Sequence, residues 1–210
     1  MLRILIADDH AVVRQGLKQI LLEEFPDASF GEATNGAEIL GLLKQQEWDV
    51  VTLDISLPGR SGLEVLKEAR ERRPTLKVLV LSMHPEEQYA VRALKAGAAG
   101  YLTKQTAPEE LVNAVKKILS GGKYVSAALA EKLASALGAP SDRPAHETLS
   151  DREYQVFCLI ASGKTTGQIA EELNLSVQTI STYRARVLEK MAMSTNAELT
   201  RYALQNGLVL

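Results

Sequence analysis

The chain has 210 residues, of which 46% are hydrophobic and 24% are charged, an ordinary composition for one large or two modest globular domains. The formal net charge of −2 excludes a general polyanion binder, so any nucleic-acid site has to come from local placement of basic side chains. The single cysteine, Cys158, excludes an internal disulfide and lies in an apolar run that predicts inert packing. We find no apolar run long enough for a signal peptide or a membrane span and expect a cytoplasmic protein.

Strand-like apolar runs alternate with amphipathic helical patterns through the first part of the chain. The predicted strands are Leu2–Ala7, Ser29–Ala33, Asp49–Leu53, Val78–Leu81 and Gly100–Thr103. The predicted helices are Ala11–Glu24, Gly36–Gln46, Gly62–Arg72, Pro85–Ala96 and Pro108–Leu119. The third and fourth strands are almost continuously apolar, which is typical of parallel strands covered on both faces. The pattern therefore predicts an α/β fold with a doubly wound, five-stranded parallel sheet.

Helical patterns dominate the remainder of the chain. A helical stretch at Ser126–Leu137 is followed by the polar segment Gly138–Thr148, whose two prolines indicate an interdomain linker. The later predicted helices are Ser150–Ser162, Thr166–Leu173, Val177–Met191 and Thr195–Asn206. Ser150 and Glu153 match a capping box, and Asn206-Gly207 is a plausible helix stop. We predict one domain at 1–120, a helical extension and linker at 121–147, and a smaller all-α domain at 148–210.

Three carboxylates follow two of the apolar strands: Asp8, Asp9 and Asp54. Because the carboxyl ends of parallel strands share one edge of the sheet, we expect these groups to converge there. Close carboxylates repel one another and favour a hard, oxygen-loving cation such as Mg²⁺. Lys104 and Ser82 end two further strands and could add an ammonium and a hydroxyl, which would complete a phosphoryl-transfer site. Taken singly, each residue is more often a turn, cap or solvated residue, but five of them at strand ends of one sheet favour function.

With the segment Leu57-Pro58-Gly59-Arg60-Ser61-Gly62, this set resembles the flavodoxin-like receiver domain of two-component response regulators, over about residues 1–120. The resemblance implies that Asp54 accepts a phosphoryl group from a sensor histidine kinase and that Lys104 contacts that group. It also implies that Asp9, Asp54 and the backbone carbonyl of Ser56 ligate Mg²⁺, with Asp8 close by.

The same resemblance implies a switch pair, Ser82 and Tyr101. Phosphorylation would draw the Ser82 hydroxyl inward and let Tyr101 occupy the vacated space, which biases the face of the fourth helix, fifth strand and fifth helix. Simple packing of Tyr101 on its strand remains the alternative.

The predicted helices Thr166–Leu173 and Val177–Met191, joined by a short break, fit a helix-turn-helix. Ser176 can cap the second helix. The apolar residues expected to pack the two helices together are Ile169, Ala170, Leu173, Ile180 and Val187. The residues expected to contact DNA are Thr179, Ser181, Thr182, Arg184, Ala185, Arg186 and Lys190. Periodicity alone supports a small helical bundle that binds protein as well as it supports a DNA-binding helix-turn-helix.

Several segments of the second domain resemble the LuxR-type helix-turn-helix domain over about residues 147–210. They are Leu149-Ser150-Asp151-Arg152-Glu153, Gln168-Ile169-Ala170-Glu171-Glu172-Leu173, Gln178-Thr179-Ile180 and Leu188-Glu189-Lys190-Met191. The two domains in this order resemble the NarL/FixJ subfamily of response regulators. The resemblance implies a DNA-binding transcription regulator rather than an enzyme, a homodimer when phosphorylated, and RNA polymerase as a further candidate partner.

The resemblance also implies that the second helix enters the major groove, with Ser181, Thr182 and Ala185 at base-facing positions. The family often has Lys or Arg at such positions, so the base preference of this chain is open. We therefore expect the basic residues Arg184, Arg186 and Lys190 to contact phosphates instead.

Three alternatives compete with this interpretation. Gly163-Lys164-Thr165 ends like a nucleotide-binding loop, but Cys158 stands where that loop needs a glycine. A phosphatase with Asp54 as nucleophile needs a general acid two residues on, where this chain has Ser56. The third alternative keeps the architecture but makes the first domain a phosphate-independent docking module, against which the full acid set and Lys104 argue.

Overall fold

The computed structural model describes residues 1–127, 129–131 and 144–209. The chain divides into two compact units, Met1–Ser135 and Ala136–Leu210. Within the predicted helix Ser126–Leu137, residues 127 and 129–131 are helical, and its last part, 132–137, lies outside the described residues, as does the first part of the predicted linker.

A parallel sheet with strand order β2-β1-β3-β4-β5 forms the centre of the first unit. Its strands are β1 (Arg3–Ala7), β2 (Ser29–Ala33), β3 (Val50–Asp54), β4 (Val78–Ser82) and β5 (Gly100–Thr103). All residues of β3 and β4 are buried, which explains their continuous apolar runs. This topology confirms the predicted doubly wound sheet, in which ligand sites form where the strand order reverses, beside β1 and β3.

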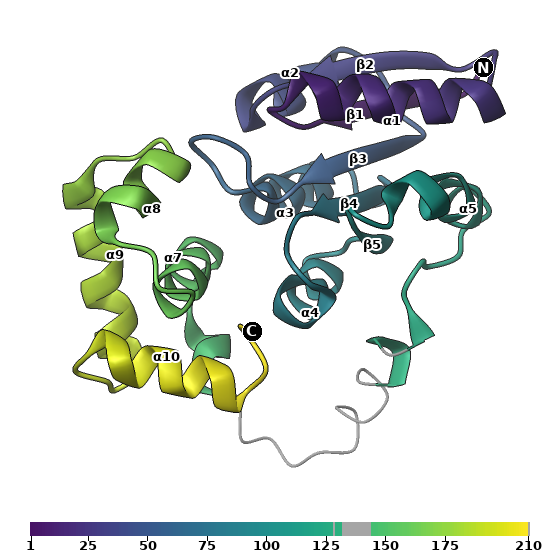
Figure 1. Ribbon diagram of the computed structural model, residues 1–210. Helices are drawn as coiled ribbons and strands as arrows, with labels where there is room; N and C mark the ends of the chain where they lie inside the picture. The colour runs from purple at the N-terminus through teal and green to yellow at the C-terminus, as the bar shows by residue number, and fades with distance from the viewer. Residues whose placement is uncertain (128, 132–143, 210) are drawn as a thin grey trace. The chain divides into compact units, whose positions relative to one another are not determined.

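Helices cover both faces of this sheet (Figure 1). They are α1 (Ala11–Glu24), α2 (Gly36–Gln45), α3 (Gly62–Arg72), α4 (Glu86–Lys95) and α5 (Ala107–Leu119). Helix α1 packs against α5, whereas α2 packs against α3 and α4 against β5. Side chains of alternating strand residues, such as Ile4 and Ile6, join Leu17 and Leu111 in the buried layer beneath α1 and α5. The packed core leaves the carboxyl ends of the strands as the rim where polar groups gather.

The turn from β3 into α3 needs a residue without a side chain at Gly62. A Cβ there would lie 2.0 Å from the carbonyl oxygen of Asp54 and 2.8 Å from the Cα of Ile55. The close approach lets the Gly62 N–H donate to the Ile55 carbonyl at 2.8 Å. Directly before it, Ser61 and Glu64 form a capping box that starts α3. The backbone that carries Asp54 is therefore held against the first turn of a helix.

Replacing Gly62 with alanine is expected to destabilise the first unit by about 1–3 kcal/mol, because the new Cβ meets backbone that cannot move aside cheaply. Gly41, inside α2, is the matched control: nothing lies within 4 Å of its would-be Cβ, so alanine should stabilise the helix by about 0.5–1 kcal/mol. Urea unfolding followed by the fluorescence of Trp48, the single tryptophan and a buried residue of this unit, measures both changes. Equal effects of the two substitutions would contradict the close approach.

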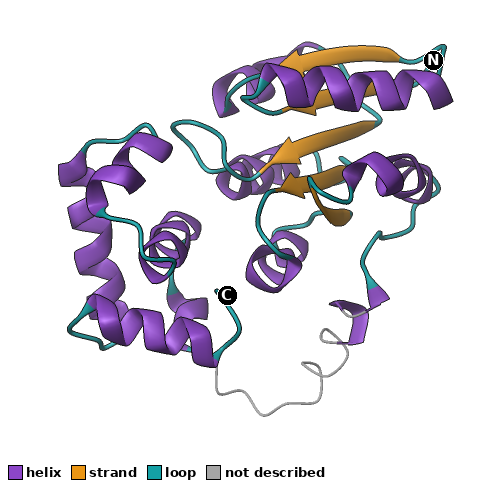
Figure 2. Ribbon diagram, in the orientation of Figure 1, coloured by secondary structure: helices purple, strands orange, loops and turns teal. Residues whose placement is uncertain are grey.

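The regular elements in the described part of the second unit are all helices, joined by short turns (Figure 2). Its elements are η1 (Ala145–Thr148), α7 (Asp151–Ala161), α8 (Thr166–Glu172), α9 (Val177–Lys190) and α10 (Asn196–Gln205). The side chains of Ser150, Thr165, Ser176 and Thr195 each accept a backbone N–H at the start of a helix. The five apolar residues predicted to hold α8 against α9 are all buried, and the two helices are in contact.

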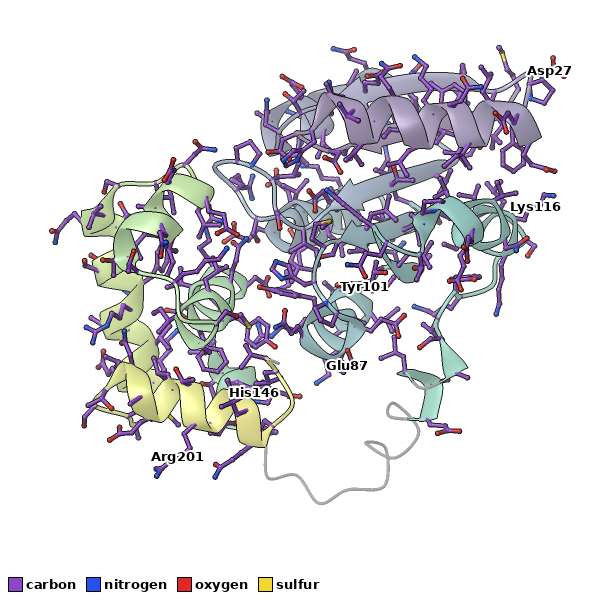
Figure 3. The ribbon with its side chains drawn as sticks, viewed as in Figure 1. Asp27, Glu87, Tyr101, Lys116, His146 and Arg201 are labelled. Atoms are coloured by element: carbon purple, nitrogen blue, oxygen red, sulfur yellow. The ribbon has the colours of Figure 1, made fainter. Side chains whose placement is uncertain are left out.

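The short 3₁₀ helix η1 lies where no regular structure was predicted. Its hydrogen bonds are local, from Glu147 N–H to the Pro144 carbonyl and from Leu149 N–H to the His146 carbonyl. Four residues give no hydrophobic period, so the sequence pattern could not reveal it. His146, labelled in Figure 3, joins η1 to α10 through a 2.9 Å hydrogen bond between its Nδ1 and the Tyr202 hydroxyl.

Candidate functional site

The strand register brings the predicted acidic residues together at one rim of the sheet. Ala7 of β1 pairs with Leu53 of β3, so the next residues, Asp8 and Asp54, begin side by side. Ligand atoms of Asp8, Asp9, Asp54 and the neighbouring His10 all lie within 4.8 Å of one another. Asp8 and Asp54 are each only 1% exposed, whereas Asp9 is partly exposed. The predicted convergence of three carboxylates is thus present in the structure.

Lys104 reaches this cluster from the residue after β5. Its backbone N–H donates to the Ser82 carbonyl at 2.7 Å, which fixes the start of the side chain. The ammonium lies 2.6 Å from Oδ2 of Asp8 and 2.8 Å from Oδ2 of Asp54. Burial opposes the charge of Lys104, but the attraction of Asp54 and hydrogen bonds to both carboxylates outweigh it and raise the pKa of Lys104. One cation therefore bridges two buried carboxylates.

The two carboxylate oxygens of Asp54 have different partners. Burial raises its pKa, although the nearby Lys104 ammonium and a hydrogen bond from the Ser56 backbone oppose the shift. The Ser56 N–H donates to Oδ1 of Asp54 at 3.0 Å, while Oδ2 faces Lys104. The residue predicted to offer a carbonyl to a metal thus also holds the carboxylate through its N–H.

Ser82 and Tyr101, the predicted switch pair, meet around the backbone of His84. Ser82 is fully buried at the end of β4, and its Oγ accepts the His84 N–H at 3.0 Å. Tyr101 is also fully buried, and its hydroxyl donates to the His84 carbonyl at 2.9 Å; Figure 3 shows the residue beside α4. Burial raises the pKa of Tyr101, so the phenol stays a neutral donor. Burial of Tyr101 agrees both with the predicted switch pair and with simple packing of this side chain on β5.

Two residues of this rim were not identified from the sequence, His10 and Arg14. The Arg14 guanidinium, from the first turn of α1, donates to the backbone carbonyls of Asp8 at 2.8 Å and Asp9 at 3.2 Å. Its Nε also pairs with Glu32 of β2 at 3.2 Å. Arg14 thereby fixes the turn that carries two of the acids. The position of His10 directly after the acid pair was the available signal, and Arg14 gave none beyond its place on α1.

The second unit presents most of the predicted DNA-contacting residues on the outer face of α9. Ser181, Thr182, Ala185 and Arg186 are exposed. Thr179 is half-buried, and its N–H donates to the capping oxygen of Ser176 at 3.0 Å. Small polar residues near the start of α9 and basic residues further along are thus displayed on one helix.

The two other predicted basic contacts are already engaged within the second unit. The Arg184 Nε donates to the Asn196 side chain at the start of α10, at 2.7 Å. The Lys190 ammonium pairs with the Glu153 carboxylate of α7 at 2.7 Å. Burial of Glu153 works against its charge, but the hydrogen bonds from Lys190 and Ser150 prevail and lower its pKa. Sequence periodicity placed both cations on the outer face but could not show these partners.

Replacing Glu153 with glutamine is expected to free the Lys190 ammonium while keeping the capping box, which glutamine also forms. Affinity for duplexes of random sequence should rise, and the slope of log affinity against log salt should steepen by about one phosphate contact. In the wild type, the pair of Lys190 and Glu153 should stabilise the folded state above about pH 4.3. This contribution to the free energy of unfolding should be lost as pH falls through the lowered pKa of Glu153. Fluorescence anisotropy at several salt concentrations measures the binding.

The same substitution in a Lys190→Met background is the control, because the ammonium that Glu153 neutralises is then gone. We expect no change in DNA affinity there. An equal gain with and without Lys190 would show that the pair has no part in setting the affinity.

The segment Gly163-Lys164-Thr165 lies between α7 and α8, so it follows a helix and not the strand that a nucleotide-binding loop requires. Lys164 pairs with Glu172 of α8. Among the described residues, none of the helices combines the length and the apolar character that a membrane crossing requires.

Both units match known protein families. Residues 4–116 match the family described as the response regulator receiver domain. Residues 147–203 match the family described as bacterial regulatory proteins of the luxR family.

Relatives of similar length align over nearly the whole chain. Response regulator UvrY of Escherichia coli K12 is 34% identical over 209 residues, covering 99% of this chain and 96% of UvrY. Response regulator GacA of Pseudomonas aeruginosa PAO1 is 35% identical over 211 residues, covering 100% of this chain and 98% of GacA. Among solved structures, RcsB from Salmonella enterica serovar Typhimurium, bound to the rprA promoter with the phosphomimetic BeF₃⁻, has a TM-score of 0.65. It is 27% identical, and the match covers 96% of this chain and 97% of RcsB.

Proposed function

The chain belongs to the NarL/FixJ response regulators, which join a receiver domain to a LuxR-type DNA-binding domain, and from this premise we propose that phosphorylation of Asp54 controls its binding to DNA. The observation that carries the proposal is the arrangement around Asp54. A buried carboxylate lies among further acids and contacts a lysine ammonium through one oxygen. That combination suits transfer of a phosphoryl group to a side-chain oxygen.

The donor is a phosphohistidine of a sensor histidine kinase. A carboxylate oxygen of Asp54 forms a bond to phosphorus as the phosphorus–nitrogen bond breaks, and the leaving imidazole keeps that electron pair and is neutralised by a proton. Lys104 contacts an oxygen of the transferred group and offsets its charge. Asp54 then carries an acyl phosphate, and the other acids remain carboxylates.

The donor set fits Mg²⁺, because carboxylate oxygens are the ligands that this ion prefers and ligand atoms of the three acids lie within 4.8 Å of one another. Asp8, Asp9, Asp54 and the Ser56 carbonyl would hold it. When bound, Mg²⁺ supplies neutralising charge beside the phosphoryl oxygens. Asp8 and Asp9 would keep this ion in place, while Arg14 fixes their backbone.

The response passes through Ser82 and Tyr101. A phosphoryl oxygen attracts the Ser82 hydroxyl, which now accepts a hydrogen bond from the His84 backbone. Tyr101 holds the same backbone through its own hydroxyl. A shift of this segment favours the form of the receiver that dimerises and releases α9 for paired DNA half-sites. RNA polymerase is a further partner of the DNA-bound dimer, and the protein acts in the cytoplasm as a transcription regulator.

On α9, Ser181, Thr182 and Ala185 face base edges in the major groove, and Arg186 contacts a phosphate. Arg184 and Lys190 contact phosphates only when they leave Asn196 and Glu153. Thr179, at the start of the helix, completes the contact surface. Serine and threonine hydroxyls can donate or accept, so these positions read several bases, and the methyl group of alanine contacts thymine.

Replacing Arg186 with alanine is expected to weaken binding by a similar factor on all duplexes, because a phosphate contact carries no sequence information. The slope of log affinity against log salt should become shallower by about one. Arg201, an exposed arginine on α10, is the matched control, and its alanine variant should change the slope less. Loss of affinity for only some sequences would assign Arg186 to base readout.

The direct test compares DNA affinity with and without beryllium fluoride, which mimics a phosphoryl group on a carboxylate. The duplex is first selected from a random-sequence library with the full chain. We expect the treated protein to bind more tightly and to shift towards a dimer in analytical ultracentrifugation. Identical DNA affinity and molecular mass with and without beryllium fluoride would contradict the proposal that phosphorylation controls DNA binding.

A further inference from the structure

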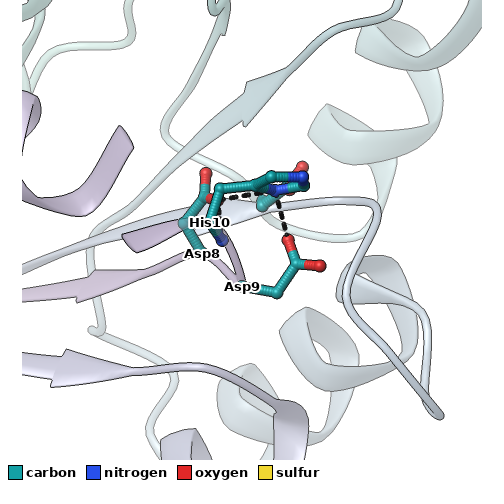
Figure 4. Close-up of side chains that lie close together, drawn as sticks. Asp8, Asp9 and His10 are labelled. Atoms are coloured by element: carbon teal, nitrogen blue, oxygen red, sulfur yellow. Dashed lines mark hydrogen bonds and ion pairs between the residues drawn. The ribbon is translucent and has the colours of Figure 1, made fainter. Parts of the chain in front are cut away.

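His10 places an imidazole nitrogen against the acidic rim (Figure 4). Its Nδ1 lies 2.7 Å from Oδ1 of Asp9 and 3.5 Å from Oδ1 of Asp8. Its backbone N–H donates to the same Asp8 oxygen at 2.9 Å, which fixes the residue at the rim. The side chain is 68% exposed and caps no N–H of α1, although His10 is the residue before that helix. The imidazole is therefore free of a structural role as a helix cap.

Two side chains contact the acids of the rim from opposite sides. Lys104 contacts Asp8 and Asp54 on the buried side, at 2.6 and 2.8 Å. His10 contacts Asp9 on the exposed side, so a metal ion from solvent would reach this nitrogen and the most exposed carboxylate from the same side. Arg14 donates to the backbone carbonyls of Asp8 and Asp9, a role that leaves their carboxylates to the metal.

The distances allow His10 to share an ion with the acids. One ligand atom from each of Asp8, Asp9, His10 and Asp54 lies within 4.8 Å of the others. Two ligands of one ion at about 2.1 Å are at most about 4.2 Å apart, so small rotations of side chains suffice. Because His10 and Asp9 are the exposed members, these rotations need no change in the core.

We propose that His10 is a metal-selectivity residue, whose Nδ1 joins the carboxylates in binding a divalent ion and shifts the preference of the site towards first-row transition ions. The inference deepens the proposed function and rests on its metal site. Imidazole nitrogen binds Co²⁺, Ni²⁺ and Zn²⁺ far better than it binds Mg²⁺, whereas carboxylates alone suit Mg²⁺. A mixed set of one nitrogen and three carboxylates therefore accepts Mg²⁺ through the oxygens but gains affinity for a transition ion through the nitrogen.

The test measures Co²⁺ and Mg²⁺ affinities of the full chain by calorimetry at about pH 8, where free imidazole is neutral. His10→Ala should weaken Co²⁺ binding at least about tenfold, the lower end of the loss seen even for outer partners of metal ligands. Its Mg²⁺ affinity should stay within about twofold of wild type. The visible absorption of bound Co²⁺ should change in the same variant, because a nitrogen ligand is replaced by water.

Two further variants keep the result interpretable. His10→Gln retains a polar side chain without the nitrogen ligand and should behave as His10→Ala does. His146→Gln removes an imidazole from the other unit and should leave Co²⁺ binding unchanged. Unchanged Co²⁺ affinity in both His10 variants, or equal losses for Co²⁺ and Mg²⁺, would overturn the inference and leave the proposed function intact. Wild-type protein that binds neither ion would overturn the metal site itself, and this inference with it.

Discussion

Replacing Lys104 with methionine is expected to destabilise the first unit by about 3–5 kcal/mol, because it leaves two buried carboxylates without their shared cation. Methionine keeps much of the length and apolar body of the lysine, so the loss reports the charge rather than a cavity. Urea unfolding followed by Trp48 fluorescence measures it without interference from the second unit. Lys116→Met removes a half-exposed pair with Glu24 of the same unit and should cost less than about 1 kcal/mol.

The loss of unfolding free energy in Lys104→Met should depend on pH in a defined direction. Burial already raises the pKa of Asp54, and removal of the ammonium beside it raises that pKa further. A carboxyl group whose pKa is raised by folding stabilises the fold below its unfolded pKa, about 3.9, and this contribution is lost as pH rises through the folded value. The difference in unfolding free energy between wild type and Lys104→Met should therefore be small near pH 4 and grow towards neutral pH.

Magnesium should recover part of this loss, because a divalent ion can replace the missing ammonium beside the two carboxylates. At about a hundred times its dissociation constant, a ligand that binds only the folded state adds about 2.7 kcal/mol. A Lys104→Met protein that is no less stable than Lys116→Met at neutral pH would show that the bridge in the structure contributes nothing to folding.

The sheet could be predicted because strands that are buried on both faces appear in the sequence as continuous apolar runs. Continuous apolar runs identified β3 and β4, and the predicted strand ends differ from the structure by at most one residue. The small extension of β3 matters, because Asp54 is part of the strand and pairs with Leu81 of β4 rather than opening a loop. Hydrophobicity could not reveal that Asp54 belongs to the strand, since membership of a sheet depends on backbone pairing and not on the character of the side chain.

The converging acids could be predicted by one topological rule, but their partners could not. Knowing that strand ends share a rim placed Asp8, Asp54 and Lys104 together. The rule says nothing about which ammonium contacts which oxygen, nor that Arg14 reaches back from α1 to the backbone of the acid pair. Similarly, Lys190 and Glu153 are 37 residues apart, and their contact depends on how α7 packs against α9. Such pairs follow from packing geometry, which periodicity does not encode.

The second large effect is expected from Asp54→Asn, which should abolish phosphoryl incorporation from acetyl phosphate and Mg²⁺. An amide is nearly isosteric with the carboxylate and can still accept a hydrogen bond from Ser56, but its oxygen is a poor nucleophile towards phosphorus. Intact-mass spectrometry measures the modification, and DNA binding should no longer respond to the donor. Asp49→Asn is the matched control, because Asp49 is an exposed carboxylate just before the opposite end of the same strand.

The two readouts separate the remaining alternatives. A protein that loses phosphorylation with Asp54→Asn, while its wild-type form binds DNA equally well with and without the donor, would make the receiver a phosphate-independent docking module. Phosphorylation that persists in the Asp54→Asn variant would move the accepting oxygen to another acid of the rim. Asp8 is the alternative to test next, because it is as buried as Asp54 and its oxygens receive the His10 N–H and the Lys104 ammonium, whereas Asp9 is partly exposed and faces His10. Among the acids of this rim, Asp54 is the one that lies within a strand, at the end of β3, with a backbone N–H on one oxygen and an ammonium beside the other, whereas Asp8 and Asp9 follow β1.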